Sequence, residues 1–227
     1  MPSKIDPEER ETTQHLIDDF AVDDTITVER VYKESWKKFN DLEEDIYFLL
    51  GIYEQVFNRK SPFLKSLPKW IHKTIYDGLY VNAGQYRLTS DPGGGKVFFG
   101  PQHAQMREQK FRGNSPKNIE RDVAKALEYF DLRDYDPLMR CLKFYQEFVF
   151  IHPFYDGNGR IGRLIANIYL TGYGLLLLWN EFDSKTKFID KLNWCHNSQS
   201  DESYQVLYNF VKKHLYSLAK FEDLDED

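Results

Sequence analysis

The sequence has little cysteine, no strongly basic region and no apolar N-terminus. It contains 2 cysteines in 227 residues, Cys141 and Cys195, too few for a scaffold held together by disulfides. The formal net charge is -6, and no basic stripe with interleaved aromatic residues occurs, so we expect no nucleic-acid partner. Residues 1–10 are polar and charged and lack the apolar core of a secretory signal.

Long uninterrupted apolar runs are missing as well. The most apolar stretch, residues 164–179, is interrupted by polar and glycine residues and is shorter than the ~20 residues that a membrane-spanning helix needs. We therefore expect no membrane partner and a cytoplasmic protein, in which this stretch forms a buried helix and its exit. Hydrophobic residues still make up 41% of the chain and aromatic residues 16%, enough for a substantial core.

The spacing of apolar residues is helical along most of the chain. It predicts helices over residues 6–20, 27–39, 42–57, 66–80, 115–132, 137–149, 160–172, from 184 past 195, and over 204–218. The predicted fold is mostly α, a helical bundle around a central helix at residues 160–172, with one β-hairpin. We divide the chain into an N-terminal helical extension (1–60), a catalytic domain (61–215) and an acidic tail (216–227).

A β-hairpin is predicted around Ser90-Asp91-Pro92-Gly93-Gly94-Gly95. Short extended runs lie on both sides of this stretch, which we interpret as a flexible tip, and the run after it is Lys96-Val97-Phe98-Phe99. Gly94-Gly95-Lys96 superficially looks like a phosphate-binding P-loop, but its spacing does not fit the Walker pattern.

Residues 152–163, HPFYDGNGRIGR, predict an anion site. Gly157 and Gly159 permit positive φ and a close approach of backbone N–H groups to a ligand. The loop leads into a helix N-terminus, which favours phosphate. Arg160 and Arg163 in the first turn oppose the helix dipole unless an anion compensates them, and their spacing places them on one face.

Two side chains before the central helix supply chemistry. His152 is suited to act as a general base, because the unperturbed pKa of histidine is about 6.5. Asp156 offers the hard oxygen ligand that Mg²⁺ prefers, completed by substrate phosphates. A polyphosphate substrate with Mg²⁺ is therefore expected.

The stretch resembles the signature of the Fic (filamentation induced by cAMP) family, His-x-Phe-x-(Asp/Glu)-Gly-Asn-Gly-(Lys/Arg)-x-x-Arg, and matches it at every specified position. The resemblance implies transfer of AMP from ATP to a Tyr, Thr or Ser hydroxyl of a target protein, releasing pyrophosphate. It implies the following roles: His152 as the base, Asp156 as the Mg²⁺ ligand, Gly157, Asn158 and Gly159 at the α- and β-phosphates, Arg160 at the β-phosphate, and Arg163 at the γ-phosphate.

The resemblance also gives the hairpin a role. Gly84-x-Tyr86-Arg87 is similar to the segment that leads into the family's flap, so Lys96, Val97 and Phe98 are expected to pair with an extended target segment. An ordinary surface hairpin is the alternative. Leu192, Asn193 and Tyr204 fall where the family approaches the nucleotide base, although core packing explains each of them better.

Other activities stay open. Related enzymes transfer UMP, phosphate or phosphocholine, and Gly159 speaks against the phosphate-transferring type, which has lysine there. A catalytically silent nucleotide-binding module is the alternative from another class.

Control of the activity is open too. The family's inhibitory helix carries (Ser/Thr)-x-x-x-Glu-(Gly/Asn), and neither Thr25 to Glu29 nor Ser198 to Glu202 completes it. We expect a protein that is active alone or silenced by a separate partner. Inhibition within the chain by Glu29 or Glu202 is the alternative.

Overall fold

The computed structural model describes residues 5–100, 111–182 and 185–219. The helices in this part are α1 (Pro7–Phe20), α2 (Val28–Glu43), α3 (Ile46–Tyr53), α4 (Leu67–Tyr76), α5 (Ile119–Leu127), α6 (Pro137–Ile151), α7 (Asn158–Thr171), α8 (Lys185–Ser198) and α9 (Asp201–Val211). The strands are β1 (Phe98–Phe99), β2 (Phe111–Arg112), β3 (Leu175–Leu177) and β4 (Leu215–Ser217). The mostly helical fold is confirmed. Within the described ranges no helix is both long and apolar enough to cross a membrane.

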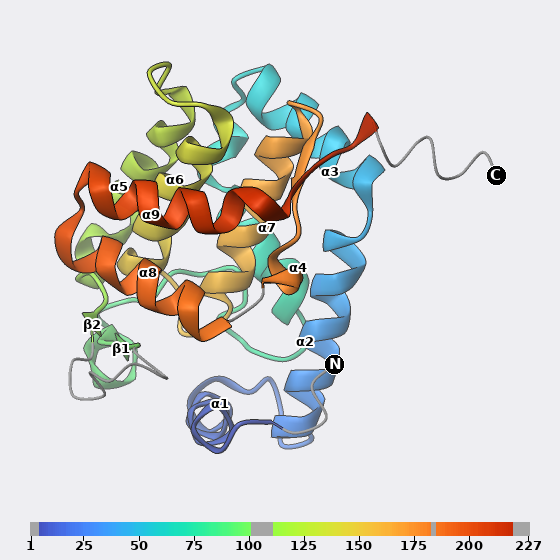
Figure 1. Ribbon diagram of the computed structural model, residues 1–227. Helices are drawn as coiled ribbons and strands as arrows, with labels where there is room; N and C mark the ends of the chain where they lie inside the picture. The colour runs from blue at the N-terminus through green and yellow to red at the C-terminus, as the bar shows by residue number, and fades with distance from the viewer. Residues whose placement is uncertain (1–4, 101–110, 183–184, 220–227) are drawn as a thin grey trace.

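Helix α7 lies at the centre of the bundle, as Figure 1 shows. The apolar side chains that follow the helical spacing are completely buried, at 0% exposure: Ile161, Leu164, Ile165 and Ile168. Helix α6 packs along α7 over the longest contact, and α2, α3 and α4 pack against its other sides. The central helix predicted from apolar spacing is therefore confirmed, beginning at Asn158.

Local sequence explains where the main helices begin. Asp6 accepts a hydrogen bond from the Glu8 N–H (2.9 Å) at the start of α1. Asp136 does the same for the Met139 N–H (3.1 Å) at the start of α6. A side-chain oxygen that satisfies a first-turn N–H stabilises a helix by ~1 kcal/mol. The long α6 thereby ends in a fixed register, which places His152 directly after it.

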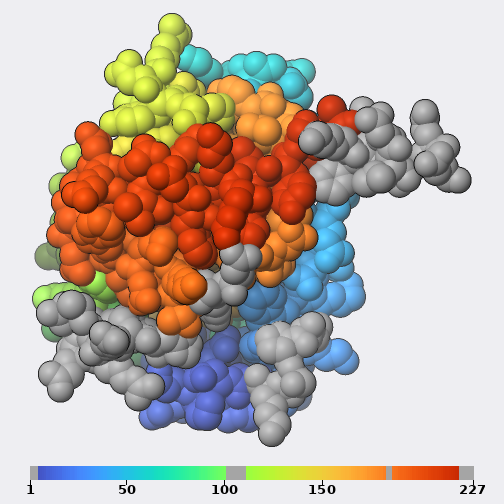
Figure 2. All heavy atoms as spheres, in the orientation of Figure 1, coloured from blue at the N-terminus to red at the C-terminus, as the bar shows by residue number. Residues whose placement is uncertain are grey.

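The N-terminal helices share the core of the bundle. Helices α2 and α3 pack against α7, and their buried side chains belong to the same cluster as those of α6 and α7. At the end of α7, a Cβ on Gly172 would lie 2.0 Å from the ring of Tyr53 in α3, so only glycine permits this contact. In the space-filling view, α8 and α9 cover much of the face towards the viewer, and the N-terminal residues lie below them (Figure 2).

The predicted position of the hairpin tip is wrong. Pro92–Gly95 forms a 3-10 turn, and β1 pairs with β2 in the register Phe98 to Arg112 and Phe99 to Phe111. Gly95 is buried, and Arg87 donates to its carbonyl oxygen. Lys96 and Val97 precede the strand, and only Phe98 of the three predicted flap residues lies in it. The connection between the strands lies outside the described residues.

The predicted last helix is also too long. Helix α9 ends at Val211, a 3-10 turn follows at Lys212–His214, and β4 pairs antiparallel with β3. No strand was expected here, because the apolar pattern of a three-residue strand is too short to be distinguished from a helix end. The strand also crosses the boundary that we drew between catalytic domain and tail at residue 215.

Candidate active site

His152 lies at the end of α6 in a left-handed conformation, with φ of 53°. Its Nδ1 lies 3.3 Å from the Val149 carbonyl oxygen. A carbonyl oxygen can only accept, so Nδ1 carries the proton and Nε2 keeps its lone pair. The ring stacks on Phe99 of β1 at 4.4 Å between centroids. The imidazole is therefore fixed in the tautomer and orientation of a proton acceptor.

The environment keeps this imidazole neutral. Burial lowers the pKa of His152 to about 4, the positive charge of Arg87 adds to the effect, and the Val149 hydrogen bond and Asp156 oppose it. At neutral pH the ring is therefore deprotonated and available to accept a proton. A pKa this far below 7 also means that the ring is a weak base, so its contribution depends on its placement against the donor.

Arg87 ties the flap to the turn that carries His152. It is 1% exposed and donates from Nε to the His152 carbonyl oxygen at 2.7 Å. Its other nitrogens reach the carbonyl oxygens of Gly95, Asn114 (3.0 Å) and Ile151 (3.3 Å). Burial lowers its pKa to about 10, so it stays charged. The sequence pointed to Arg87 only as part of the segment before the flap.

The glycine loop is held in shape by its own side chains. Asn158 accepts from the Phe154 N–H at 3.0 Å and donates to the Phe154 carbonyl oxygen at 2.8 Å. Gly157 has φ of 78°, and a Cβ there would meet the Tyr76 ring at 2.9 Å. The Asn158 side chain therefore closes the loop, while the first N–H groups of α7 have no partners within the helix and suit an anion.

Asp156 and Arg160 form a buried pair behind the loop. Arg160 contacts both carboxylate oxygens of Asp156, at 3.4 Å and 3.3 Å, and Asp156 accepts from the Gly157 N–H at 2.5 Å. Burial raises the pKa of Asp156, but Arg160 and hydrogen bonds from Tyr76 and Gly157 lower it, with a net shift below the usual value. Asp156 is therefore ionised, as a cation ligand must be.

Arg163 lines a pocket of about 500 Å³ together with Gly159. Its Nε lies 3.3 Å from the Gly159 carbonyl oxygen, and its guanidinium carbon lies 5.5 Å from the Phe39 ring centroid. Further lining residues are aromatic and aliphatic, among them Tyr145, Trp179, Phe182, Phe188, Ile189 and Leu192. The pocket thus joins a positively charged end at α7 to an apolar end suited to a planar base.

The polar atoms of this pocket fit a nucleotide. Trp36 Nε1, Trp179 Nε1 and Asn193 Nδ2 are buried and have no hydrogen-bond partner in the described part of the chain. All three are donors and all three residues line the pocket. Unpaired buried donors are costly, so a ligand rich in acceptors, such as the ring nitrogens, ribose and phosphates of a nucleotide, would stabilise them.

His196 adds a further donor that the sequence analysis missed. Tyr204 donates to Gln146 Oε1, and Gln146 Nε2 lies 2.9 Å from His196 Nδ1. Because the amide oxygen of Gln146 accepts from Tyr204, its amide nitrogen donates to His196 Nδ1. The proton of the His196 ring therefore lies on Nε2. His196 also lines the pocket. Three residues were considered as contacts of the nucleotide base. Leu192 and Asn193 line the pocket, whereas Tyr204 packs in the core beside Lys143.

The two glutamates considered for inhibition are engaged elsewhere or exposed. Glu29 pairs with Arg10 at 2.7 Å, and Glu202 is exposed in the first turn of α9. The spacing of the inhibitory pattern occurs instead at Ser35-x-x-x-Phe39-Asn40, with phenylalanine at the glutamate position. The Phe39 ring lies beside Arg163 and offers it no carboxylate.

The described residues contain no group of three or more His, Cys, Asp or Glu that could hold a metal. Mg²⁺ usually binds through one or two carboxylates and substrate phosphates, so the ionised Asp156 carboxylate next to the glycine loop fits it.

The part of the chain that contains His152 and the glycine loop is similar to a known family. Residues 62–170 match the model of the Fic/DOC family. Over 97 residues it is 33% identical to a Fido domain-containing protein of Dictyostelium discoideum, covering 43% of this chain and 60% of the relative. Over 131 residues it is 30% identical to a probable protein adenylyltransferase of Aquifex aeolicus, covering 56% of this chain and 35% of the relative.

Solved structures confirm the Fic fold. A Fic domain-containing signaling protein of Bacteroides thetaiotaomicron superposes with a TM-score of 0.58 at 21% identity, over 79% of this chain and 66% of that chain. The BepC effector of Bartonella tribocorum, solved with bound AMPPNP, superposes with a TM-score of 0.52 at 14% identity, over 83% of this chain and 88% of that chain.

Three buried neutral histidines predict acid sensitivity. Burial lowers the pKa of His72 and His196 to about 3 and that of His152 to about 4. Below about pH 6.5 the unfolded chain binds more protons than the folded protein. The free energy of unfolding therefore falls by up to ~1.4 kcal/mol per histidine for each pH unit of acidification. The stability they contribute is complete above pH 6.5 and is lost progressively towards pH 3–4.

Thermal unfolding between pH 7 and pH 4.5 measures this loss. A His72→Gln variant keeps an acceptor for the Gly84 N–H, which lies 2.8 Å from Nδ1, and should show a shallower pH dependence. Replacement of the exposed His15 should leave the wild-type slope. A wild-type melting temperature that does not change with pH over this interval would contradict the prediction.

Proposed function

We propose that the protein is a protein adenylyltransferase that transfers AMP from Mg²⁺-ATP to a Tyr, Thr or Ser hydroxyl of a target protein. The observation that carries the proposal is the tautomer of His152, whose Nε2 keeps its lone pair and whose ring stacks on Phe99, a residue that lines the pocket beside Arg163. The similarity to a probable protein adenylyltransferase supports it. The buried donors without partners among the described lining residues support a nucleotide as the bound substrate.

In this proposal His152 Nε2 accepts the proton of the target hydroxyl. The hydroxyl oxygen then attacks the α-phosphorus in line, a new P–O bond forms, and the bond to the β-phosphate oxygen breaks to release pyrophosphate. The N–H groups at the start of α7 and Arg163 stabilise negative charge on the phosphates. Asp156 would hold Mg²⁺, which supplies charge neutralisation of the phosphates.

The flap is proposed to present the target. Phe98 is 62% exposed on β1, whereas its neighbour Phe99 stacks on His152. A target segment that pairs with β1 would therefore lie close to the proton acceptor, in the manner of a strand added to a sheet edge. Lys96 and Val97, directly before the strand, would contact the same segment.

We also propose that inhibition, if present, acts through a separate partner. Phe39 occupies the position at which the inhibitory pattern has glutamate, and Arg163 stays available for the γ-phosphate. Glu43 lies within the field of Arg163: burial raises the pKa of Glu43, and the positive charge of Arg163 opposes that shift.

The function is tested by incubating the purified protein with Mg²⁺-ATP and a cell lysate. Mass spectrometry should then find adenylyl adducts on Tyr, Thr or Ser side chains that are missing when the nucleotide is withheld. Parallel incubations with UTP, GTP and CTP establish the base preference. Binding of ATP without any adduct on lysate proteins or on the enzyme itself would instead favour a silent nucleotide-binding module.

Arg163→Ala is expected to weaken binding of ATP more than binding of AMP. A charge-assisted hydrogen bond contributes ~1.5–3 kcal/mol, so the affinity for ATP should fall by roughly 10- to 150-fold. Calorimetric titration with ATP and AMP measures both affinities. Arg133→Ala removes an exposed arginine and is the control. Equal ATP affinity in wild type and Arg163→Ala would exclude the γ-phosphate role.

A further inference from the structure

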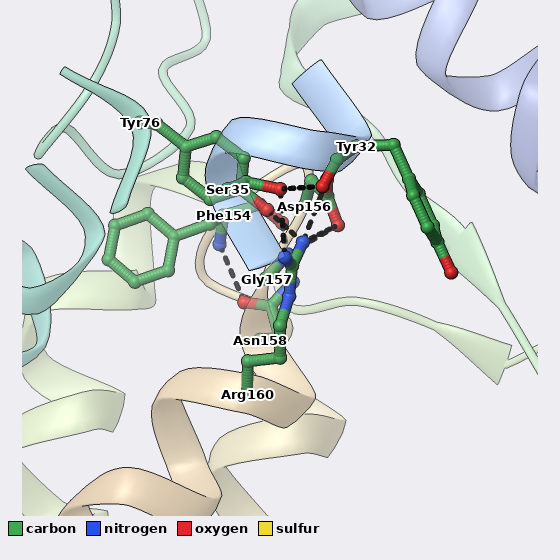
Figure 3. A network of polar contacts seen from close by, with 8 residues as sticks. All are labelled: Tyr32, Ser35, Tyr76, Phe154, Asp156, Gly157, Asn158 and Arg160. Atoms are coloured by element: carbon green, nitrogen blue, oxygen red, sulfur yellow. Dashed lines mark hydrogen bonds and ion pairs between the residues drawn. The ribbon is translucent and has the colours of Figure 1, made fainter. Parts of the chain in front are cut away.

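Arg160 is engaged entirely by the protein. It is 8% exposed and donates to Ser35 Oγ at 3.0 Å, to the Tyr76 hydroxyl and to both oxygens of Asp156. Its guanidinium carbon also lies 4.9 Å from the centroid of the Trp36 ring. Figure 3 shows the Asp156 carboxylate, the Tyr76 hydroxyl and Ser35 converging on this one guanidinium.

The partners of Arg160 come from helices far from the loop in sequence. Ser35 and Trp36 lie on α2, and Tyr76 lies at the end of α4. Ser35 and Trp36 fall outside residues 62–170, the part that matches the family. The N-terminal helix α2 therefore completes the surroundings of a residue in the central loop, and no pattern in the loop itself could reveal this.

Moving Arg160 to a phosphate would cost more than it gains. A buried charge that loses its partner is strongly destabilised, and withdrawal would leave Asp156 without its counter-charge. The Tyr76 and Ser35 hydroxyls would also lose their hydrogen bonds. Arg163, by contrast, lines the pocket, where it contacts the Gly159 carbonyl oxygen and the Phe39 ring. The two arginines thus have different tasks.

The geometry around Asp156 defines the task of Arg160. Gly157 and Arg160 contact the carboxylate from two sides, and an ionised carboxylate has about four lone-pair sites, so it can still bind a cation. Residues behind a metal ligand fix its orientation, and their loss typically weakens metal binding by ~10- to 100-fold.

We propose that Ser35, Trp36 and Tyr76 are positioning residues that hold Arg160 against Asp156, so that Arg160 orients the metal-binding carboxylate instead of contacting the β-phosphate. The inference rests on the proposed function, because it assumes a divalent cation between Asp156 and the nucleotide. It assigns to the N-terminal extension a direct part in building the metal site.

The test measures metal and nucleotide binding separately. Mn²⁺ replaces Mg²⁺ as a paramagnetic probe, and its binding is followed by electron paramagnetic resonance in the presence of AMPPNP. AMPPNP affinity without metal is measured by calorimetry. The full-length variants are Ser35→Ala, Tyr76→Phe and the double variant. Ser35→Thr restores a hydroxyl, and Tyr86→Phe removes a buried tyrosine hydroxyl that has no partner among the described residues.

We expect the double variant to bind Mn²⁺ ~10- to 100-fold more weakly while its metal-free AMPPNP affinity stays within about twofold of wild type. Each single variant should show a smaller loss, and Ser35→Thr and Tyr86→Phe should behave as wild type. If the double variant does not fold, the Mn²⁺ and AMPPNP affinities of the single variants decide the result.

Two results would overturn the proposal. Unchanged Mn²⁺ affinity in folded variants would show that the network does not position the carboxylate. An equal loss of metal-free AMPPNP binding would show that Arg160 serves the phosphates. Failure of the wild-type protein to bind AMPPNP with Mn²⁺ is a different outcome, which counts against the proposed function itself.

Discussion

His152→Ala is expected to reduce AMP transfer by ~10²–10⁴-fold, the usual contribution of a positioned general base. The affinity for Mg²⁺-ATP should remain nearly unchanged, because the phosphates are expected to bind the start of α7 and Arg163. Since the pKa of His152 is lowered to about 4, the wild-type rate should lose this base only as the pH falls towards 4. Transfer rates and ATP titrations at several pH values measure both effects.

The control for this variant is His15→Ala, which removes a histidine whose side chain is 74% exposed on α1. It should retain wild-type transfer. Full transfer activity in His152→Ala would exclude His152 as the base. A large loss of ATP affinity in the same variant would instead indicate that the imidazole contacts the nucleotide.

Asp156→Asn is expected to remove most of the activity and its dependence on Mg²⁺. An amide keeps the volume of the side chain but loses the charge that a hard divalent cation requires. The metal stabilises developing charge by several kcal/mol, so we expect a loss of ~10²–10⁴-fold in rate. Rates measured across a series of Mg²⁺ concentrations give the result.

This substitution also leaves Arg160 without its counter-charge, so the melting temperature must be measured with the rate. Asp45→Asn is the matched control, because Asp45 caps the Phe48 N–H at 2.9 Å and asparagine caps equally well. A folded Asp156→Asn protein that still responds to Mg²⁺ as wild type does would show that the cation binds elsewhere.

The sequence by itself predicted an anion site in the loop and determined the central helix. The spacing of Gly157, Asp156 and the two arginines predicted the anion site, and the apolar spacing after Arg160 predicted a buried helix that the structure confirms. These features are local, since three or four residues decide whether a backbone takes positive φ or begins a helix. The roles of His152, Asp156 and Arg163 stay predictions that the experiments above test.

Only the tertiary structure decided which residues surround that loop. Ser35 and Trp36 reach Arg160 across 125 and 124 positions of sequence, and Tyr204 orients His196 through Gln146 on another helix. The hairpin was misplaced for the same reason, because the buried Arg87 binds the carbonyl oxygen of Gly95 and holds that glycine in the interior. Contacts between distant segments depend on how helices pack, and packing leaves no periodic pattern in the sequence that could name the partners.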